Sequence, residues 1–175
     1  MDLADVLDDG FERIRGVTHR AVEGLAPGLL LFRPDPASNS IAWLVWHLTR
    51  IQDDHVADVM GQEQIWTAQG WVDRFGLPFD PADTGYGHRS EDVAAVQIDD
   101  PEVLLGYHDA VHERTVAYVR DLRPRDLDRI VDEAWDPPVT LGLRLVSVIA
   151  DDLQHGGQAA YVRGLAERLA SRPDT

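Results

Sequence analysis

The segment Ile41-Ala-Trp-Leu-Val-Trp-His-Leu48 decides how the rest of this sequence is interpreted. It contains seven apolar residues and one histidine, and its apolar pattern continues to Met60 before Gly61. A pattern of this length that stops at a glycine predicts a helix from about residue 41 to 60. If the histidine is buried among these apolar neighbours, it must find a polar partner.

Two further segments carry apolar residues at steps of three and four, which is the spacing of an amphipathic helix. The first runs from about residue 3 to 25, and we expect the dipeptide Pro27-Gly28 to end it. The second opens at Asp100-Pro101, a pair typical of the cap and first turn of a helix, and ends before Pro124.

A last long helix is expected from about residue 140 to 169, after Pro137 and Pro138. Its apolar positions again recur at helical spacing, and we expect them to face the protein core. They are Leu143, Val146, Ile149, Leu153, Ala160, Tyr161 and Leu165.

Four helices of this length, without an alternating strand pattern, predict an all-α four-helix bundle, and we expect a single domain over residues 1–175. The connection from about residue 61 to 100 is much longer than the roughly 2–8 residues common between bundle helices. We therefore expect this connection to be structured, with a short helix near residues 90–94. Its aromatic residues either pack it onto the bundle or make it a lid or pocket wall. They are Trp66, Trp71, Phe75, Phe79 and Tyr86.

The composition excludes several kinds of chemistry. The 175 residues include 31 Asp and Glu against 16 basic residues, all of them Arg, which gives a formal net charge of -15. This excess of acid repels phosphate backbones and anionic lipids, so we expect neither nucleic acid nor a membrane as a partner. The absence of Cys and Lys rules out a cysteine nucleophile, a disulfide and Schiff-base chemistry.

The start of the sequence has no basic region followed by an apolar run. No apolar stretch approaches the ~18 residues that would indicate a membrane span. We therefore expect a cytoplasmic protein.

Three residues form a candidate metal site. Asp151 and His155 are spaced i, i+4, so they project from the same face of the last helix. This face lies near the border of the core, because Ile149 and Leu153 belong to the apolar side. With His47 from another helix, two histidines and a carboxylate can hold a divalent first-row metal inside a bundle. Such a site leaves positions free for water or substrate, whereas a closed structural zinc site would need a fourth protein ligand.

The same residues also have ordinary structural interpretations. A histidine on an apolar face is commonly a hydrogen-bonded core residue, and an Asp–His pair at this spacing is commonly a surface ion pair. A rival metal pair exists as well, because His108 and His112 form a His-x-x-x-His motif, a spacing that zinc sites use. These two residues lie among Asp109, Glu113 and Arg114, and we interpret them as solvated surface.

Three further residues are candidates for supporting roles. Asp54 lies seven residues after His47, nearly on the same helix face, and is a candidate hydrogen-bond acceptor for a ligating imidazole. Arg144 lies seven residues before Asp151 and either holds a substrate carboxylate or forms a surface ion pair. Gln158 lies one turn beyond Asp151 and His155 on the last helix, and it either orients a ligand or forms a hydrogen bond across helices.

Several motifs recur together in one known family. They are Ser40-Ile-Ala-Trp-Leu-Val-Trp-His47-Leu48, the segment from Trp135 to Val148, and Asp151-Asp-Leu-Gln-His155-Gly-Gly-Gln158. With Gly85-Tyr-Gly-His88 before the third long helix, they resemble the DinB-like superfamily and, within it, the mycothiol-dependent transferase branch. The early histidine combined with the late ligand-x-x-x-His-x-Gly-Gln pattern is the most specific element.

The resemblance implies a four-helix bundle, commonly a homodimer, that holds a zinc- or nickel-type divalent ion. Carried over to this chain, the metal ligands are His47, Asp151 and His155. Many relatives have His or Glu where this chain has Asp151, and the shorter Asp side chain could change the metal or its affinity. Many also have Arg at Gly156. Two adjacent glycines cost about 1 kcal/mol each in a helix, which suggests a close helix approach at Gly156-Gly157.

The resemblance also implies a function. A divalent ion can bind a small thiol and stabilise it as thiolate, and the implied thiol is mycothiol. The acceptor would be a small electrophile, which gives S-transfer or thiol-assisted isomerisation. Two other functions stay open: a metal- or ligand-binding bundle without turnover, and hydrolysis by a metal-bound hydroxide.

Overall fold

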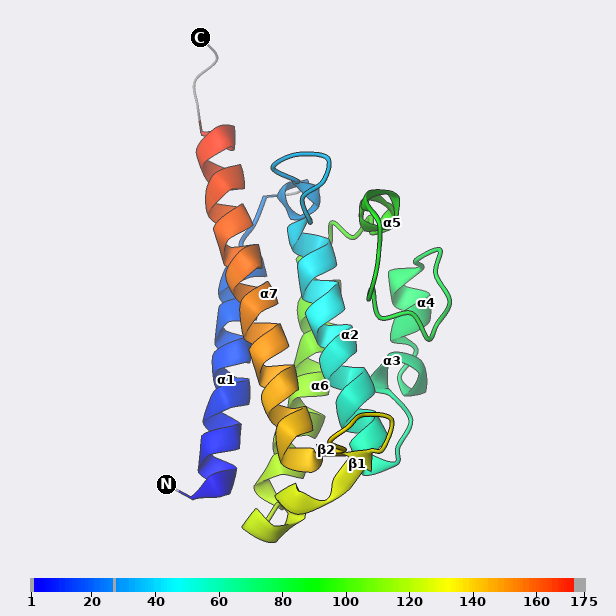
Figure 1. Ribbon diagram of the computed structural model, residues 1–175. Helices are drawn as coiled ribbons and strands as arrows, with labels where there is room; N and C mark the ends of the chain where they lie inside the picture. Colours follow the sequence, from blue (N-terminus) through cyan, green and yellow to red (C-terminus); the bar gives the residue numbers. More distant parts are fainter. Residues whose placement is uncertain (1, 27, 172–175) are drawn as a thin grey trace.

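Four long helices form a bundle in the computed structural model, which describes residues 2–26 and 28–171 (Figure 1). They are α1 (Leu3–Val22), α2 (Ile41–Met60), α6 (Pro101–Arg120) and α7 (Leu141–Ala170). Helices α1 and α7 run in one direction, and α2 and α6 run in the opposite direction (Figure 1). Helix α7 packs against α1 and α2, and α6 packs against the same two helices. The predicted all-α four-helix bundle is confirmed.

Shorter elements lie in the connections between these helices. They are the 3-10 turn η1 (Leu29–Leu31), the helices α3 (Ile65–Ala68), α4 (Trp71–Phe75) and α5 (Ser90–Ala95), the 3-10 turn η2 (Pro124–Asp128), and the strands β1 (Ile130–Asp132) and β2 (Val139–Thr140). The two strands pair antiparallel, with Ile130 opposite Thr140. The short helix predicted near residues 90–94 is α5. Within the described residues, no helix has both the length and the apolar character that a membrane span requires.

Polar caps set the ends of two helices where the sequence predicts them. Ser40 Oγ accepts a hydrogen bond from Trp43 N at the start of α2, and Gly61 ends this helix with a φ of 64°. Asp100 accepts a hydrogen bond from Glu102 N at the start of α6. Each side-chain oxygen satisfies a backbone N–H that has no partner within the helix.

Helix α1 is shorter than the sequence suggests. It ends at Val22, and Gly24 turns the chain with a φ of 68°. Glycine adopts this left-handed conformation without the steric cost that other residues meet. Of the dipeptide expected to end the helix, Pro27 lies outside the described residues, and Gly28 precedes η1 with a φ of 85°.

The inward face of α7 differs from the one that the apolar pattern predicts. Several residues expected in the core are exposed: Leu143, Val146, Leu153, Ala160 and Tyr161. The buried face consists of Leu141, Leu145, Val148, Asp152, Gly156, Ala159, Val162 and Ala166. Its small residues bring α7 close to α1, since a Cβ atom on Gly156 would lie 2.6 Å from Val17 Cγ1. The predicted core face of α7 was wrong because the close fit of its small residues against α1 outweighed the burial of its larger apolar side chains.

Two apolar clusters make up the core, and buried polar side chains separate them. Thr18, Gln52 and Asp152 lie on three helices, each between residues of the two clusters on its own helix. Gln52 Nε2 donates to Thr115 Oγ1 at 2.8 Å, whereas the carboxyl group of Asp152 has no hydrogen-bond partner in the described part of the chain. Burial, together with the charge of Asp151, raises the pKa of Asp152 well above its usual range.

Aromatic side chains pack the connection between α2 and α6 onto the bundle. Trp66, Trp71 and Phe75 are buried around Tyr107 of α6, with ring centroids 5.1, 5.7 and 5.7 Å from that of Tyr107. Tyr86, in contrast, is 90% exposed. Packing onto the bundle is therefore confirmed for the three buried rings.

We predict opposite effects for alanine at the two adjacent glycines of α7. Gly156→Ala should lower the free energy of unfolding by about 1–3 kcal/mol, because its methyl group would overlap Val17. Gly157→Ala should raise it by up to about 1 kcal/mol, because alanine favours the helix and a Cβ there meets no described residue within 4 Å. Urea unfolding followed by circular dichroism measures both. Equal effects would contradict the close approach of α7 to α1.

Candidate metal centre

Helices α2 and α7 bring the three predicted ligands together. His47 comes from α2, and Asp151 and His155 come from successive turns of α7. One ligand atom from each residue lies within 4.8 Å of the other two. The two imidazole centroids are 4.8 Å apart, and Asp151 Oδ1 is 3.7 Å from His155 Nε2. The helical spacing and the pairing of α2 with α7 together produce this group.

Hydrogen bonds fix both imidazoles in the same tautomer. His47 Nδ1 lies 2.6 Å from the backbone carbonyl oxygen of Thr84, and His155 Nδ1 lies 2.8 Å from Gln158 Oε1. Since both oxygens can only accept, each neutral ring carries its proton on Nδ1. Each Nε2 atom therefore keeps its lone pair. A metal-ligating histidine usually donates a hydrogen bond from its other ring nitrogen in this way.

The carboxylate of Asp151 completes the donor set. Within residues 2–26 and 28–171, nothing donates a hydrogen bond to its buried Oδ2 atom. A buried oxygen without a partner is unfavourable unless a cation or a water molecule meets it. Two imidazole nitrogens and one carboxylate oxygen are donors that fit a divalent first-row metal ion.

Burial lowers the pKa of His47, and the nearby His155 lowers this pKa as well. The carbonyl of Thr84 and the charge of Asp151 act in the opposite direction without cancelling the effect of burial. The lowered pKa favours the neutral imidazole, which is the form that binds metal.

Trp43 forms a wall beside both histidines. Its ring stacks on that of His47 with 4.6 Å between centroids, and it meets the ring of His155 edge-on at 6.3 Å. Trp43 Nε1 donates to His88 Nδ1 at 3.1 Å, and His88 Nε2 donates to Asp83 Oδ2 at 3.0 Å. Helical spacing could not link His88 to Trp43, because the two residues lie 45 positions apart in the sequence.

Gly85 allows the connection to approach α2 at this point. Its φ of 88° is a conformation that favours glycine. A Cβ atom at this position would lie 2.8 Å from Trp46 and 2.9 Å from His47 Nδ1. The carbonyl of Thr84 therefore reaches His47 because the next residue has no side chain.

Asp54 does not accept the hydrogen bond from His47 that its position on α2 suggested. Its Oδ1 atom accepts from Gln64 Nε2 at 2.6 Å. The acceptor for His47 is Thr84, in a segment that sequence reasoning did not connect with α2. His47 and Asp54 have different partners because the seven-residue step from one to the other spans nearly two helical turns. The connection meets α2 with Thr84 at His47 and with Gln64 at Asp54.

The two residues predicted to bind substrate lie on α7 in different surroundings. Gln158 holds His155, as described above. Arg144 Nη2 donates to Asp132 Oδ2 of β1 at 2.7 Å, and its Nη1 atom lies 3.4 Å from His55 Nδ1. A role of Arg144 or Gln158 in substrate binding stays a prediction.

His108 and His112 are buried, so their interpretation as solvated surface was wrong. His108 Nδ1 lies 3.3 Å from Thr49 Oγ1, and His112 Nε2 donates to Glu12 Oε1 at 3.2 Å. The charged neighbours on α6 pair with α1 and α2, which turns this face inward. Burial lowers the pKa of His108 to about 3. In the part of the chain that the structure describes, neither residue belongs to a group of three potential metal ligands.

Comparison with known proteins identifies relatives of this chain. The sequence matches the DinB superfamily over residues 10–159. The structure is similar to the crystal structure of a conserved protein of locus from Enterococcus faecalis, with a TM-score of 0.89 and 27% sequence identity. The similarity covers 96% of this chain and 99% of that chain. No curated protein matches the sequence significantly.

We predict that His47→Ala removes metal retention and that His108→Ala does not. The first substitution deletes a ligand, so the loss of zinc affinity should exceed the roughly 10–100-fold that an outer hydrogen-bond partner contributes. The second deletes a buried histidine outside the three-ligand group. Metal content after zinc loading and desalting measures both, with circular dichroism as the control for folding. Equal metal loss in two folded variants would show that the wrong histidine cluster was assigned.

Proposed function

Because the chain belongs to the DinB superfamily and its three candidate ligands converge, we propose that it binds a divalent metal ion of the zinc or nickel type. His47 Nε2, His155 Nε2 and an oxygen of Asp151 would hold the ion. The observation that carries this proposal is that an acceptor oxygen lies within hydrogen-bond distance of Nδ1 in both imidazoles, which leaves the lone pair on Nε2.

The proposed reaction is the transfer of a mycothiol-type thiol to a small electrophile. A bound divalent ion lowers the pKa of a coordinated thiol and so supplies a thiolate nucleophile. The chain contains neither Cys nor Lys, so a small-molecule thiol provides the nucleophile that the protein lacks. Trp43 covers one face of His47 and limits the access of water from that side.

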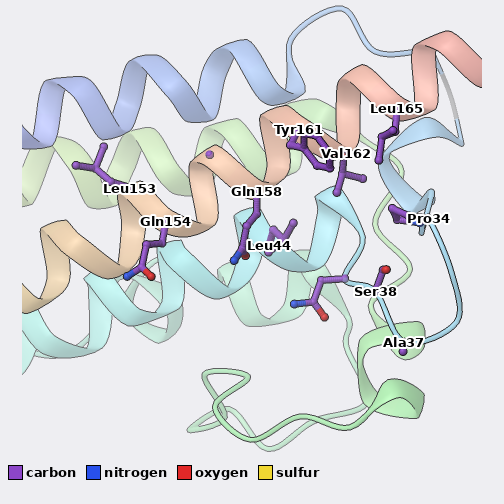
Figure 2. Close-up of a pocket in the computed structure, with 12 residues that line it drawn as sticks. Pro34, Ala37, Ser38, Leu44, Leu153, Gln154, Gln158, Tyr161, Val162 and Leu165 are labelled. Carbon is purple, nitrogen blue, oxygen red and sulfur yellow. The ribbon is translucent and has the colours of Figure 1, made fainter.

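A groove beside the candidate ligands suits the electrophile. It has a volume of about 820 Å³ and lies between α7 and the segment that leads into α2 (Figure 2). The three candidate ligands do not line the groove, but Gln158, which holds His155, does, and it links the groove to the candidate ligands. Apolar side chains form much of its wall: Leu44, Leu153, Tyr161, Val162 and Leu165.

The groove favours a neutral, largely apolar electrophile. None of the described residues that line it carries a charge, although 27% of the residues in the chain are charged. A charged ligand would lose its hydration there without gaining an opposite charge. Arg144 is paired with Asp132, so an anionic substrate would have to displace this partner. These features support transfer to a neutral acceptor over isomerisation of a carboxylate substrate.

A homodimer is also part of the proposal. Trp135, Leu143 and Val146 are exposed at the start of α7 and in the turn before it. Large exposed apolar side chains commonly mark an interface, and a second copy of the chain would bury them.

We expect consumption of a neutral electrophile to require an added small thiol and a divalent ion together. Omitting either one should reduce the rate to the background without enzyme, because the chain has no thiol of its own. Activity should persist below the usual thiol pKa of about 8.5. Mass spectrometry of the thioether product, with thiol consumption measured in parallel, provides the test.

The control compares a neutral electrophile with one that carries an added carboxylate on the same reactive group, and the neutral compound should react faster. Turnover of the electrophile at an unchanged rate without thiol would contradict the transferase proposal and indicate metal-dependent hydrolysis. Metal binding without turnover for a panel of neutral electrophiles would instead indicate a binding protein.

A further inference from the structure

Arg50 is fully buried, and its guanidinium group donates hydrogen bonds to the connection between α2 and α6 rather than pairing closely with one carboxylate. Its Nε atom donates to the carbonyl oxygen of Asp83 at 3.2 Å, and Nη2 donates to that of Pro81 at 3.1 Å. Nη1 donates to Gln64 Oε1 at 2.6 Å. The nearest carboxylate contact, to Asp53 Oδ2, is longer at 3.9 Å. One side chain of α2 thus holds two separate parts of the connection, one before α3 and one after α4.

The segment that Arg50 holds leads directly to the metal ligand. Thr84 follows Asp83, and its carbonyl oxygen accepts the hydrogen bond from His47 Nδ1 at 2.6 Å. Asp83 Oδ1 also accepts a hydrogen bond from Gly85 N at 2.7 Å, which closes the turn around Thr84. Since Arg50 lies three residues after His47 on α2, the anchor and the anchored ring occupy adjacent turns of one helix.

We propose that Arg50 is a positioning residue for the metal centre: by fixing the backbone at Pro81 and Asp83, it places the Thr84 carbonyl that sets the tautomer of His47. A neutral imidazole can carry its proton on either nitrogen, and the acceptor that it meets decides which. Without this carbonyl, Nε2 would be protonated in part of the molecules and would lose its lone pair there. The part of this inference that concerns metal affinity rests on the proposed function.

The guanidinium group suits this task better than an ammonium group would. Its planar fork directs several N–H donors in fixed directions, so it can satisfy two carbonyls and an amide oxygen at once. The ammonium group of lysine is a point charge on a flexible stem. Lysine at position 50 would keep a positive charge near Asp53 and lose the fixed span across Pro81 and Asp83.

A purely structural role of Arg50 is the alternative, and Arg114 provides the matched control. Arg114 also joins this buried group, because it forms an ion pair with Asp53 and donates to the carbonyl oxygen of Glu63. Its described contacts do not include the segment from Pro81 to Gly85. Loss of Arg114 should therefore weaken the fold without moving the acceptor of His47.

The experiment compares the wild-type protein with Arg50→Lys and Arg114→Lys. Nitrogen-15 histidine NMR of the metal-free proteins at about pH 8, where imidazoles are neutral, identifies the tautomer of His47. We expect protonated Nδ1 in the wild type and in Arg114→Lys, and a mixture in Arg50→Lys. Zinc affinity should fall by about 10- to 100-fold in Arg50→Lys and stay near the wild-type value in Arg114→Lys.

Gly85→Ala gives a second variant if Arg50→Lys does not fold. Its methyl group would press on His47 Nδ1 and displace the Thr84 carbonyl, so the same change of tautomer is expected. Protonated Nε2 in the wild type would overturn the inference. The inference would also be overturned if folded Arg50→Lys or Gly85→Ala protein kept the wild-type tautomer of His47 and the wild-type zinc affinity. If the wild type binds no zinc, the proposed function fails, and the tautomers alone still decide the role of Arg50.

Discussion

The hydrogen bond from His47 Nδ1 to the carbonyl of Thr84 is the contact on which the candidate metal centre depends. It joins two residues that are 37 positions apart and determines which nitrogen of the ring keeps its lone pair. His47 lies within an apolar stretch of α2, between Trp46 and Leu48, whose side chains cannot accept a hydrogen bond. A backbone carbonyl supplies the acceptor instead, and the glycine at position 85 allows it to come close enough.

The connection between α2 and α6 is long because the two helices run in the same direction, so the chain returns along the bundle between them (Figure 1). Its tight packing supports the hydrogen bond to His47. Asp53, which is fully buried on α2, accepts hydrogen bonds from the backbone N–H groups of Ile65 and Trp66 at the start of α3. The buried aromatic rings around Tyr107 fix the next part of the chain. The connection can then return to α2 as a stable segment and present a carbonyl at a defined place.

The sequence predicted what depends on local spacing. Helix limits near Ser40 and Asp100 follow from caps, and the approach of Asp151 to His155 follows from the helical repeat. Features that depend on contacts between distant segments were missed or wrong. The burial of His108 depends on how α6 meets its neighbours, and the inward face of α7 depends on the fit of small residues against α1, while the apolar pattern favoured the opposite face.

X-ray absorption spectroscopy of the zinc-loaded protein identifies the ligands of the metal directly. We predict a first shell that contains two imidazole nitrogens and a carboxylate oxygen at about 2.0–2.2 Å, with any further ligands supplied by water or an added thiol. Addition of a small thiol should introduce one sulfur at about 2.3 Å. A first shell of oxygen atoms without imidazole scattering would contradict the assignment of His47 and His155 as ligands.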